Sequence, residues 1–155
     1  MDKVIFNYSD IDLLLEKTQN SKKILIGGCF DLLHYGHFFF LKKAKELGGK
    51  LIVALESDEH IKKMKGRNSI HDISKRAEML KELVNVDYVV KLPLFSKDTE
   101  YEDLVLKIRP NFIAVTQGDL NFYKKKKHAE LVGATVVEVA PNLTHYSTSK
   151  ILEIN

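Results

Sequence analysis

The sequence has little of what marks exported, membrane or metal-binding proteins. Its single cysteine, Cys29, cannot form an internal disulfide and lacks the paired spacing of a zinc site, so the reducing cytoplasm is the expected compartment. No signal-peptide pattern follows Met1, and no apolar run approaches the roughly 20 residues that span a bilayer, so no membrane association is predicted. A net charge of only +3 argues against nucleic acid as a partner and favours a small anionic ligand.

Short β-rich runs alternate with helical periodicity along the 155 residues. Strands are expected near residues 23–28, 50–55, 86–91, 112–116 and 135–139. Helices are expected near residues 36–47, 57–64, 74–84, 98–108 and 121–132. The alternation predicts an α/β fold with a doubly wound parallel sheet of about five strands, in a single domain covering residues 1–155. Residues 1–22 are expected to form an N-terminal helical extension ahead of the first strand.

The most informative stretch joins the first of these strands to the helix that follows. It reads Gly27-Gly28-Cys29-Phe30-Asp31-Leu32-Leu33-His34-Tyr35-Gly36-His37. His34 and His37 fall where a helix begins, and free backbone N–H groups and the positive end of the helix dipole favour a phosphate there. Gly28 and Gly36 leave room for a phosphate to approach the backbone. The chain has no G-x-x-x-x-G-K-[ST] and no G-x-G-x-x-G after the strand, which excludes a P-loop and the dinucleotide fingerprint.

This stretch resembles the cytidylyltransferase-like nucleotidyltransferases, whose signature is a strand followed by G-x-F-D-x-x-H-x-G-H. Residues 28–37 match it at every fixed position, and residues 147–151 match the family's second signature, S-T-[TS]-x-[IL], at the start of the last helix. The resemblance implies a Rossmann-like fold of the HxGH type. It also implies transfer of a nucleoside monophosphate from ATP or CTP, accompanied by Mg²⁺, to a phosphate monoester, with release of pyrophosphate.

The same resemblance assigns roles to individual residues. His37 is expected to contact the α-phosphate in the transition state, with His34 beside it and Lys65 reaching the acceptor phosphate or the triphosphate. These three are the predicted catalytic residues. The predicted nucleotide-binding residues are Gly28, Cys29, Phe30, Gly36, Arg76, Gly118, Asp119, Ser147 and Thr148. No residue is predicted to bind a metal directly.

Several polar residues are given a structural interpretation. Asp31 is expected to orient the turn by accepting backbone hydrogen bonds, and Cys29 to pack rather than act as a nucleophile. The lysine tract at residues 124–127 is interpreted as a solvated helical face. The remaining histidines are expected at the surface or in loops. They are His60, His71, His128 and His145.

The resemblance leaves the acceptor open between three enzymes. Residues 27–31 and 65–70 are similar to the N-G-C-F-D and K-G-x-x-R-P-[IV] segments of heptose 1-phosphate adenylyltransferases, which makes a sugar phosphate the leading acceptor. Glycerol-3-phosphate cytidylyltransferase and an archaeal-type FAD synthetase are the alternatives. A non-catalytic nucleotide-binding regulatory domain is a fourth interpretation. The expected partners are a small-molecule nucleotide, a phosphorylated acceptor and, as is common in the family, a second copy of the chain.

Overall fold

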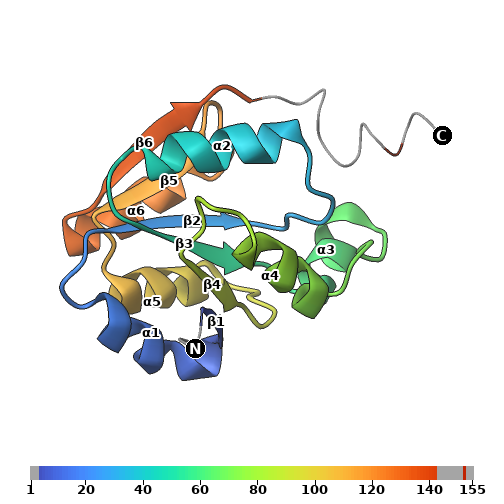
Figure 1. Ribbon diagram of the computed structural model, residues 1–155, viewed down its shortest axis with the longest axis horizontal. Coiled ribbons are helices and arrows are strands. Elements are labelled where there is room, and N and C mark those ends of the chain that lie inside the picture. The colour runs from blue at the N-terminus through green and yellow to red at the C-terminus, as the bar shows by residue number, and fades with distance from the viewer. Residues whose placement is uncertain (1–3, 143–151, 153–155) are drawn as a thin grey trace.

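The computed structural model describes residues 4–142 and 152, and these contain a six-stranded parallel sheet. The strand order is β1-β4-β3-β2-β5-β6 (Figure 1). The strands are β1 Ile5–Asn7, β2 Lys23–Gly28, β3 Lys50–Leu55, β4 Tyr88–Lys91, β5 Phe112–Thr116 and β6 Thr135–Ala140. The helices are α1 Ile11–Thr18, α2 Tyr35–Lys45, α3 Asp58–Lys65, α4 Ile73–Lys81, α5 Asp98–Ile108 and α6 Phe122–Val132. The predicted α/β fold is confirmed.

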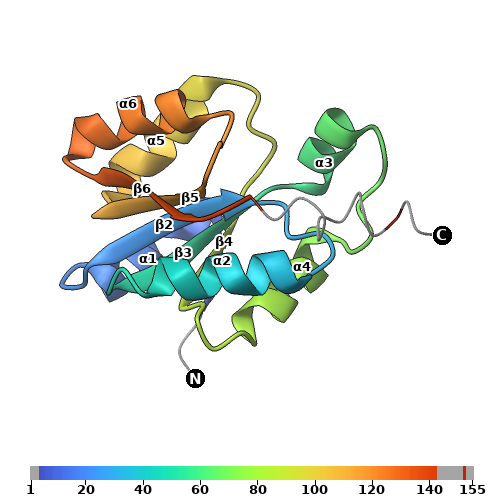
Figure 2. The ribbon, with the colours of Figure 1, turned by 90° about the horizontal axis from the view of Figure 1, so that it is seen from above.

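Helices cover both faces of the sheet, α2 and α4 on one and α5 and α6 on the other (Figure 2). The strands are buried on both faces, and alternate residues enter different cores. Ile24 and Ile26 of β2 pack in the core with α2 and α4, while Leu25 packs in the core with α1, α5 and α6. This two-sided burial explains why the central strands are nearly continuous hydrophobic runs in the sequence.

The N-terminal segment differs from the helical extension expected for residues 1–22. Ile5–Asn7 forms an edge strand that pairs in parallel with β4, so the sheet has six strands instead of about five. Phe6 and Leu14 are fully buried. Residues 4–22 therefore contribute to the same sheet and core as the rest of the described chain.

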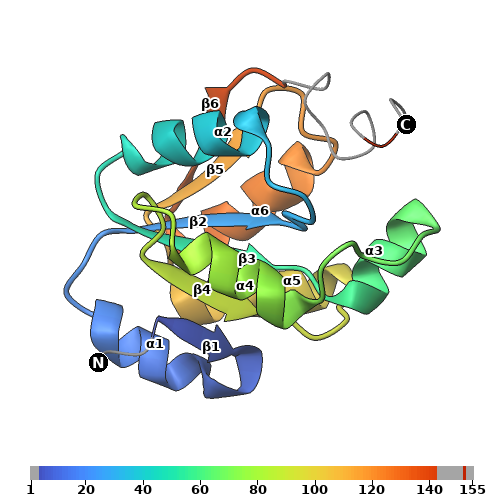
Figure 3. The same cartoon turned by 45° about the vertical axis from the view of Figure 1, so that its right-hand side comes forward.

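The chain reverses its strand order beside β2, which lies between β3 and β5. In doubly wound sheets, such a switch point leaves a crevice at the carboxyl ends of the strands. The α3 helix projects beyond that end of the sheet (Figure 3). Among the described residues, no helix is both long enough and apolar enough to cross a membrane.

Candidate active site

The turn after β2 brings two histidine rings together at the start of α2. His34 is the N-cap of this helix, and its carbonyl accepts hydrogen bonds from the backbone N–H groups of His37 and Phe38 at 3.0 and 3.3 Å. The two imidazoles stack with their centroids 3.7 Å apart. Each Nδ1 atom is buried and has no hydrogen-bond partner within the described part of the chain. Because buried polar atoms are normally paired, these two nitrogens mark the histidine turn as a candidate ligand site.

The surroundings of His34 and His37 lower the pKa values of both rings. Burial and the charge of Lys65 lower the pKa of His34 below its usual value. Burial, together with His34 and Lys65, lowers the pKa of His37 to about 3. Both rings are therefore neutral at pH 7 without a ligand. A bound phosphate would supply the negative charge that this cluster lacks and would raise both pKa values.

The two rings face a cavity of about 270 Å³ at the carboxyl ends of β2 and β5. Seven of the residues predicted from the sequence line this cavity. They are Gly28, Cys29, Phe30, His34, Gly36, His37 and Asp119. Pro141 and Asn142 line it as well, immediately before the segment that contains Ser147 and Thr148. Those two residues lie outside the described part of the chain.

The backbone of the turn is shaped by its aromatic residue. Phe30 adopts a φ of +46°, a left-handed conformation that is strained for a side chain other than glycine. Its ring lies so close to Gly28 that a Cβ there would be 2.7 Å from the ring. A side chain at position 28 would therefore have to displace the Phe30 ring, and glycine avoids this contact while leaving the backbone open to a phosphate.

The Gly118-Asp119 turn brings a lysine to the same cavity. Asp119 accepts a hydrogen bond from the backbone of Asn121 and forms an ion pair with Lys125, each at 2.7 Å. Lys125 lines the cavity with Asp119. The interpretation of residues 124–127 as a solvated face therefore fails for Lys125, because the start of α6 turns this side chain toward the ends of the strands.

The loop between α3 and α4 is attached to the histidine turn by Asp31. Its carboxylate accepts hydrogen bonds from the backbone N–H groups of Ile70 and His71 at 2.8 and 3.2 Å, and from Arg67 at 2.8 Å. Burial alone would raise the pKa of Asp31, but these hydrogen bonds outweigh it and hold the pKa below its usual value. The predicted structural role is confirmed, although the N–H donors belong to this loop and not to the turn itself.

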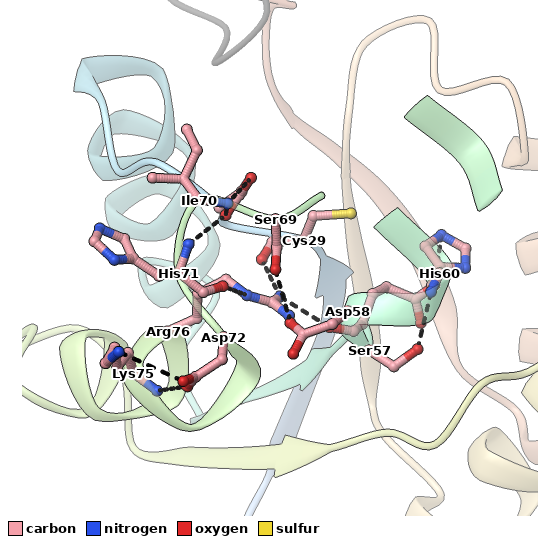
Figure 4. Close-up of polar contacts among 12 residues, drawn as sticks. Cys29, Ser57, Asp58, His60, Ser69, Ile70, His71, Asp72, Lys75 and Arg76 are labelled. Atoms are coloured by element: carbon pink, nitrogen blue, oxygen red, sulfur yellow. Dashed lines mark hydrogen bonds and ion pairs between the residues drawn. The ribbon is translucent and has the colours of Figure 1, made fainter. Parts of the chain in front are cut away.

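Arg76 lies beneath the site instead of lining the cavity. The residue is 1% exposed, and all three guanidinium nitrogens donate to protein acceptors (Figure 4). These acceptors are the carbonyls of Cys29, Glu56 and His71 and the carboxylate of Asp58. Arg76 therefore positions the ends of β2 and β3 against the loop. The expectation that it binds nucleotide directly is corrected, because no guanidinium nitrogen remains accessible.

Lys65 lies at the last position of α3, exposed to solvent, immediately before Gly66 and Arg67. Its charge contributes to the lowered pKa values of His34 and His37, which places it within electrostatic reach of both rings. Burial raises the pKa of the Cys29 thiol, and the opposing charge of Lys65 does not overcome it. Cys29 is therefore a neutral thiol, as its packing interpretation requires.

A second cavity, of about 470 Å³, opens on the α5 and α6 side of the sheet. It shares Gly27, Gly28 and Lys125 with the first cavity, so the two meet at the end of β2. Its polar lining includes Glu56 and Tyr101, which the sequence analysis missed. Glu56 directly follows β3, and this position at a strand end was the only available signal.

Two histidines expected at the surface or in loops also line the second cavity. His128 is 3% exposed, and its Nε2 atom lies 3.0 Å from Asp98. His60 is partly buried, and its Nε2 atom lies 2.9 Å from Glu56. The expectation of a surface position is wrong for His128, because α6 packs this face against α5.

One group of three metal-ligating side chains occurs among the described residues. Ligand atoms of Asp98, Glu102 and His128 lie within 4.8 Å of one another. Asp98 and His128 line the second cavity and not the first. No such group is found at the histidine turn in the described residues.

The parallel sheet, its switch point and the histidine turn define the nucleotidyltransferase class of α/β domains. A family model described as cytidylyltransferase-like matches residues 25–154. The chain belongs to this family.

Individual relatives differ in how much of their length the chain matches. The bifunctional protein HldE of Helicobacter hepaticus is 37% identical over 99% of the chain, but the match covers only 30% of HldE. The FAD synthase of Pyrococcus horikoshii is 39% identical over 84% of the chain and 90% of that protein. The chain therefore spans less than a third of HldE but nearly the full length of the FAD synthase.

Solved structures support the same fold. A lipopolysaccharide core biosynthesis protein from Thermoplasma volcanium superposes with a TM-score of 0.64 at 25% identity, covering 79% of this chain and 98% of that one. A pantoate-beta-alanine ligase from Francisella tularensis gives a TM-score of 0.68 at 13% identity, covering 90% and 67%. At that identity, the ligase shows likeness of fold alone.

Proposed function

We propose that the protein transfers a nucleoside monophosphate from a Mg²⁺-bound nucleoside triphosphate to a phosphate monoester and releases pyrophosphate. The single observation that carries this proposal is the stacked pair His34 and His37, neutral and with both Nδ1 atoms unpartnered, in a cavity at the start of an 11-residue helix. N–H donors placed where negative charge develops suit phosphoryl chemistry better than a nucleophile or a general base would.

In the proposed reaction, an acceptor phosphate oxygen attacks the α-phosphorus in line, and the bond to the pyrophosphate oxygen breaks. His37 donates a hydrogen bond to the α-phosphate, His34 donates beside it, and Lys65 offsets the charge of the two anions. Gly28 and Gly36 allow close approach of the backbone, and Gly118 and Asp119 border the nucleotide. Ser147 and Thr148 are proposed to bind the β- and γ-phosphates.

The proposed acceptor is a sugar phosphate of the heptose 1-phosphate type, and the proposed nucleotide is ATP. The motif resemblance to heptose 1-phosphate adenylyltransferases and the 37% identity to an HldE protein support this choice. A second candidate acceptor is flavin mononucleotide, since the FAD synthase relative is matched over 90% of its length. A cytoplasmic homodimer is also proposed, and Tyr35 and Phe38 on α2 are 58% and 47% exposed.

A pyrophosphate-release assay tests the proposal directly. ATP and CTP are each combined with heptose 1-phosphate, glycerol 3-phosphate or flavin mononucleotide, and we expect the fastest release with ATP and heptose 1-phosphate. Preference for flavin mononucleotide or for CTP with glycerol 3-phosphate would select the corresponding alternative. Nucleotide binding by calorimetry without turnover on any acceptor would refute the transferase and favour a regulatory domain.

A further inference from the structure

A hydrogen-bonded cluster in the second cavity is not used by the phosphate chemistry. Glu56 Oε2 accepts a hydrogen bond from the Tyr101 hydroxyl at 2.7 Å and lies 2.9 Å from Nε2 of His60. The three residues come from the end of β3, from α5 and from α3, and all of them line the cavity. We call Glu56, His60 and Tyr101 the hydroxyl cluster.

The hydroxyl cluster has the chemistry to bind hydrogen-bond donors. Glu56 is 7% exposed, and a carboxylate buried this deeply is costly unless its oxygens are well supplied with donors. Both contacts described above use Oε2, whereas a carboxylate has about four acceptor sites. Burial and the neighbouring carboxylate raise the pKa of Tyr101, so its phenol keeps its proton. Ligand hydroxyls suit such a cluster, whereas a phosphate would be repelled by Glu56.

The cavity also offers positive charge beside the hydroxyl cluster. Lys125 and the Gly27-Gly28 backbone belong to both cavities, and Lys63, Lys97 and Lys124 line the second one. Glu56 adjoins the end of β2, because its backbone N–H donates to the Gly28 carbonyl at 3.0 Å. Apolar side chains such as Leu92, Phe95 and Leu104 complete the lining and can pack against the C–H face of a sugar ring. A molecule that fits this lining carries hydroxyls for the hydroxyl cluster and an anionic group for Lys125.

We propose that this cavity is the acceptor subsite and that the hydroxyl cluster selects a polyhydroxylated phosphate monoester. The acceptor binds with its hydroxyls at Glu56 and Tyr101 and its phosphate toward Lys125 and the end of β2, where the α-phosphorus is approached. This inference rests on the proposed nucleotidyl transfer and adds the orientation and the selecting residues of the acceptor.

Steady-state kinetics on two variants test the proposal. Glu56→Gln and Tyr101→Phe are assayed with the acceptor from the panel above that the wild type uses, with acceptor and ATP varied separately. Removing one charge-assisted hydrogen bond is expected to raise KM for the acceptor roughly tenfold or more and to leave KM for ATP within about twofold. Glu59→Gln and Tyr123→Phe are matched controls, because both residues are exposed.

The outcomes separate this inference from the proposed function. Acceptor KM values that stay at the wild-type level in both variants would overturn the inference and leave the transferase intact. Equal increases in the KM for acceptor and for ATP would also overturn it, because a merely structural cluster would disturb both subsites. Wild-type inactivity on every acceptor would refute the proposed function, and this inference with it. Tyr101→Phe keeps the test available if thermal melting shows Glu56→Gln to be unfolded.

Discussion

Asp31 offers a test of how the site is assembled, because one carboxylate joins the histidine turn to the loop that follows Lys65. Its side chain is 0% exposed, and Arg67, which pairs with it, is 26% exposed. Asp31→Asn keeps the shape of the side chain but removes the charge. It also places an amide NH₂, which cannot accept a hydrogen bond, where Oδ2 now accepts from Arg67 and Ile70.

The expected cost follows from burial. Breaking a buried ion pair by removing one partner costs about 3 to 5 kcal/mol. Partial exposure of Arg67 places this case near the lower limit, so we expect the free energy of unfolding to fall by about 3 kcal/mol. For a chain of this size, that corresponds to a decrease in Tm of roughly 6 to 12 °C.

Urea denaturation and thermal melting at pH 7.5 measure this loss. Asp72→Asn is the matched control. Asp72 caps α4 by accepting a hydrogen bond from the Lys75 backbone N–H, and its side chain is 52% exposed. Asparagine caps a helix equally well, so this variant makes the same chemical change without breaking a buried ion pair. The control should leave the free energy of unfolding close to that of the wild type. An Asp31→Asn protein no less stable than the control would refute the role assigned to Asp31. We also expect kcat/KM for transfer to fall by up to about 100-fold, because the segment around Lys65 loses its anchor.

Two further predictions concern the histidines. His37→Ala should lower kcat by about 100- to 1,000-fold while leaving the thermal melt at pH 7.5 nearly unchanged, because the ring lines a cavity with its Nδ1 unpaired; a fully active variant contradicts the mechanism. The pKa of His37 is lowered to about 3, so the unfolded chain binds more protons than the folded protein between about pH 6.5 and 3. The free energy of unfolding therefore decreases as the pH is lowered through that range. We expect the free energy of unfolding to decrease by about 2 kcal/mol between pH 7 and 5 in the wild type and by less in His37→Ala. Urea denaturation at both pH values measures this, and equal decreases in the two proteins would refute the lowered pKa assigned to His37.

Most of the fold could be predicted because its signals are local. Runs of β-branched and aliphatic residues mark β2, β3 and β5, and the predicted bounds of these strands coincide with the observed ones. The exception is β1, where three residues are too few to show a periodic pattern. Its pairing with β4 joins segments more than 80 residues apart in the sequence, and no local pattern predicts which strand it pairs with.

The roles of single side chains were harder to predict when burial decided them. Arg76 was expected to bind the nucleotide, but its guanidinium donates to carbonyls that follow β2 and β3 and to one on the loop before α4. His128 lies in a lysine-rich helix, and only the packing of α6 against α5 shows that it is buried. The neighbouring sequence of a charged residue does not distinguish a solvent-exposed side chain from a buried one whose hydrogen bonds are all made within the protein.

The order of residues alone specified the histidine turn, because the end of a strand, a glycine and the first turn of a helix follow one another in the chain and the backbone geometry is local. Tertiary structure decided what surrounds that turn. Asp31 meets the loop near residue 70, and Glu56 meets Tyr101 across 45 residues, only because parallel strands bring their carboxyl ends to one edge. The reaction class therefore follows from a short motif, whereas the proposed selection of the acceptor depends on contacts that exist only in the folded chain.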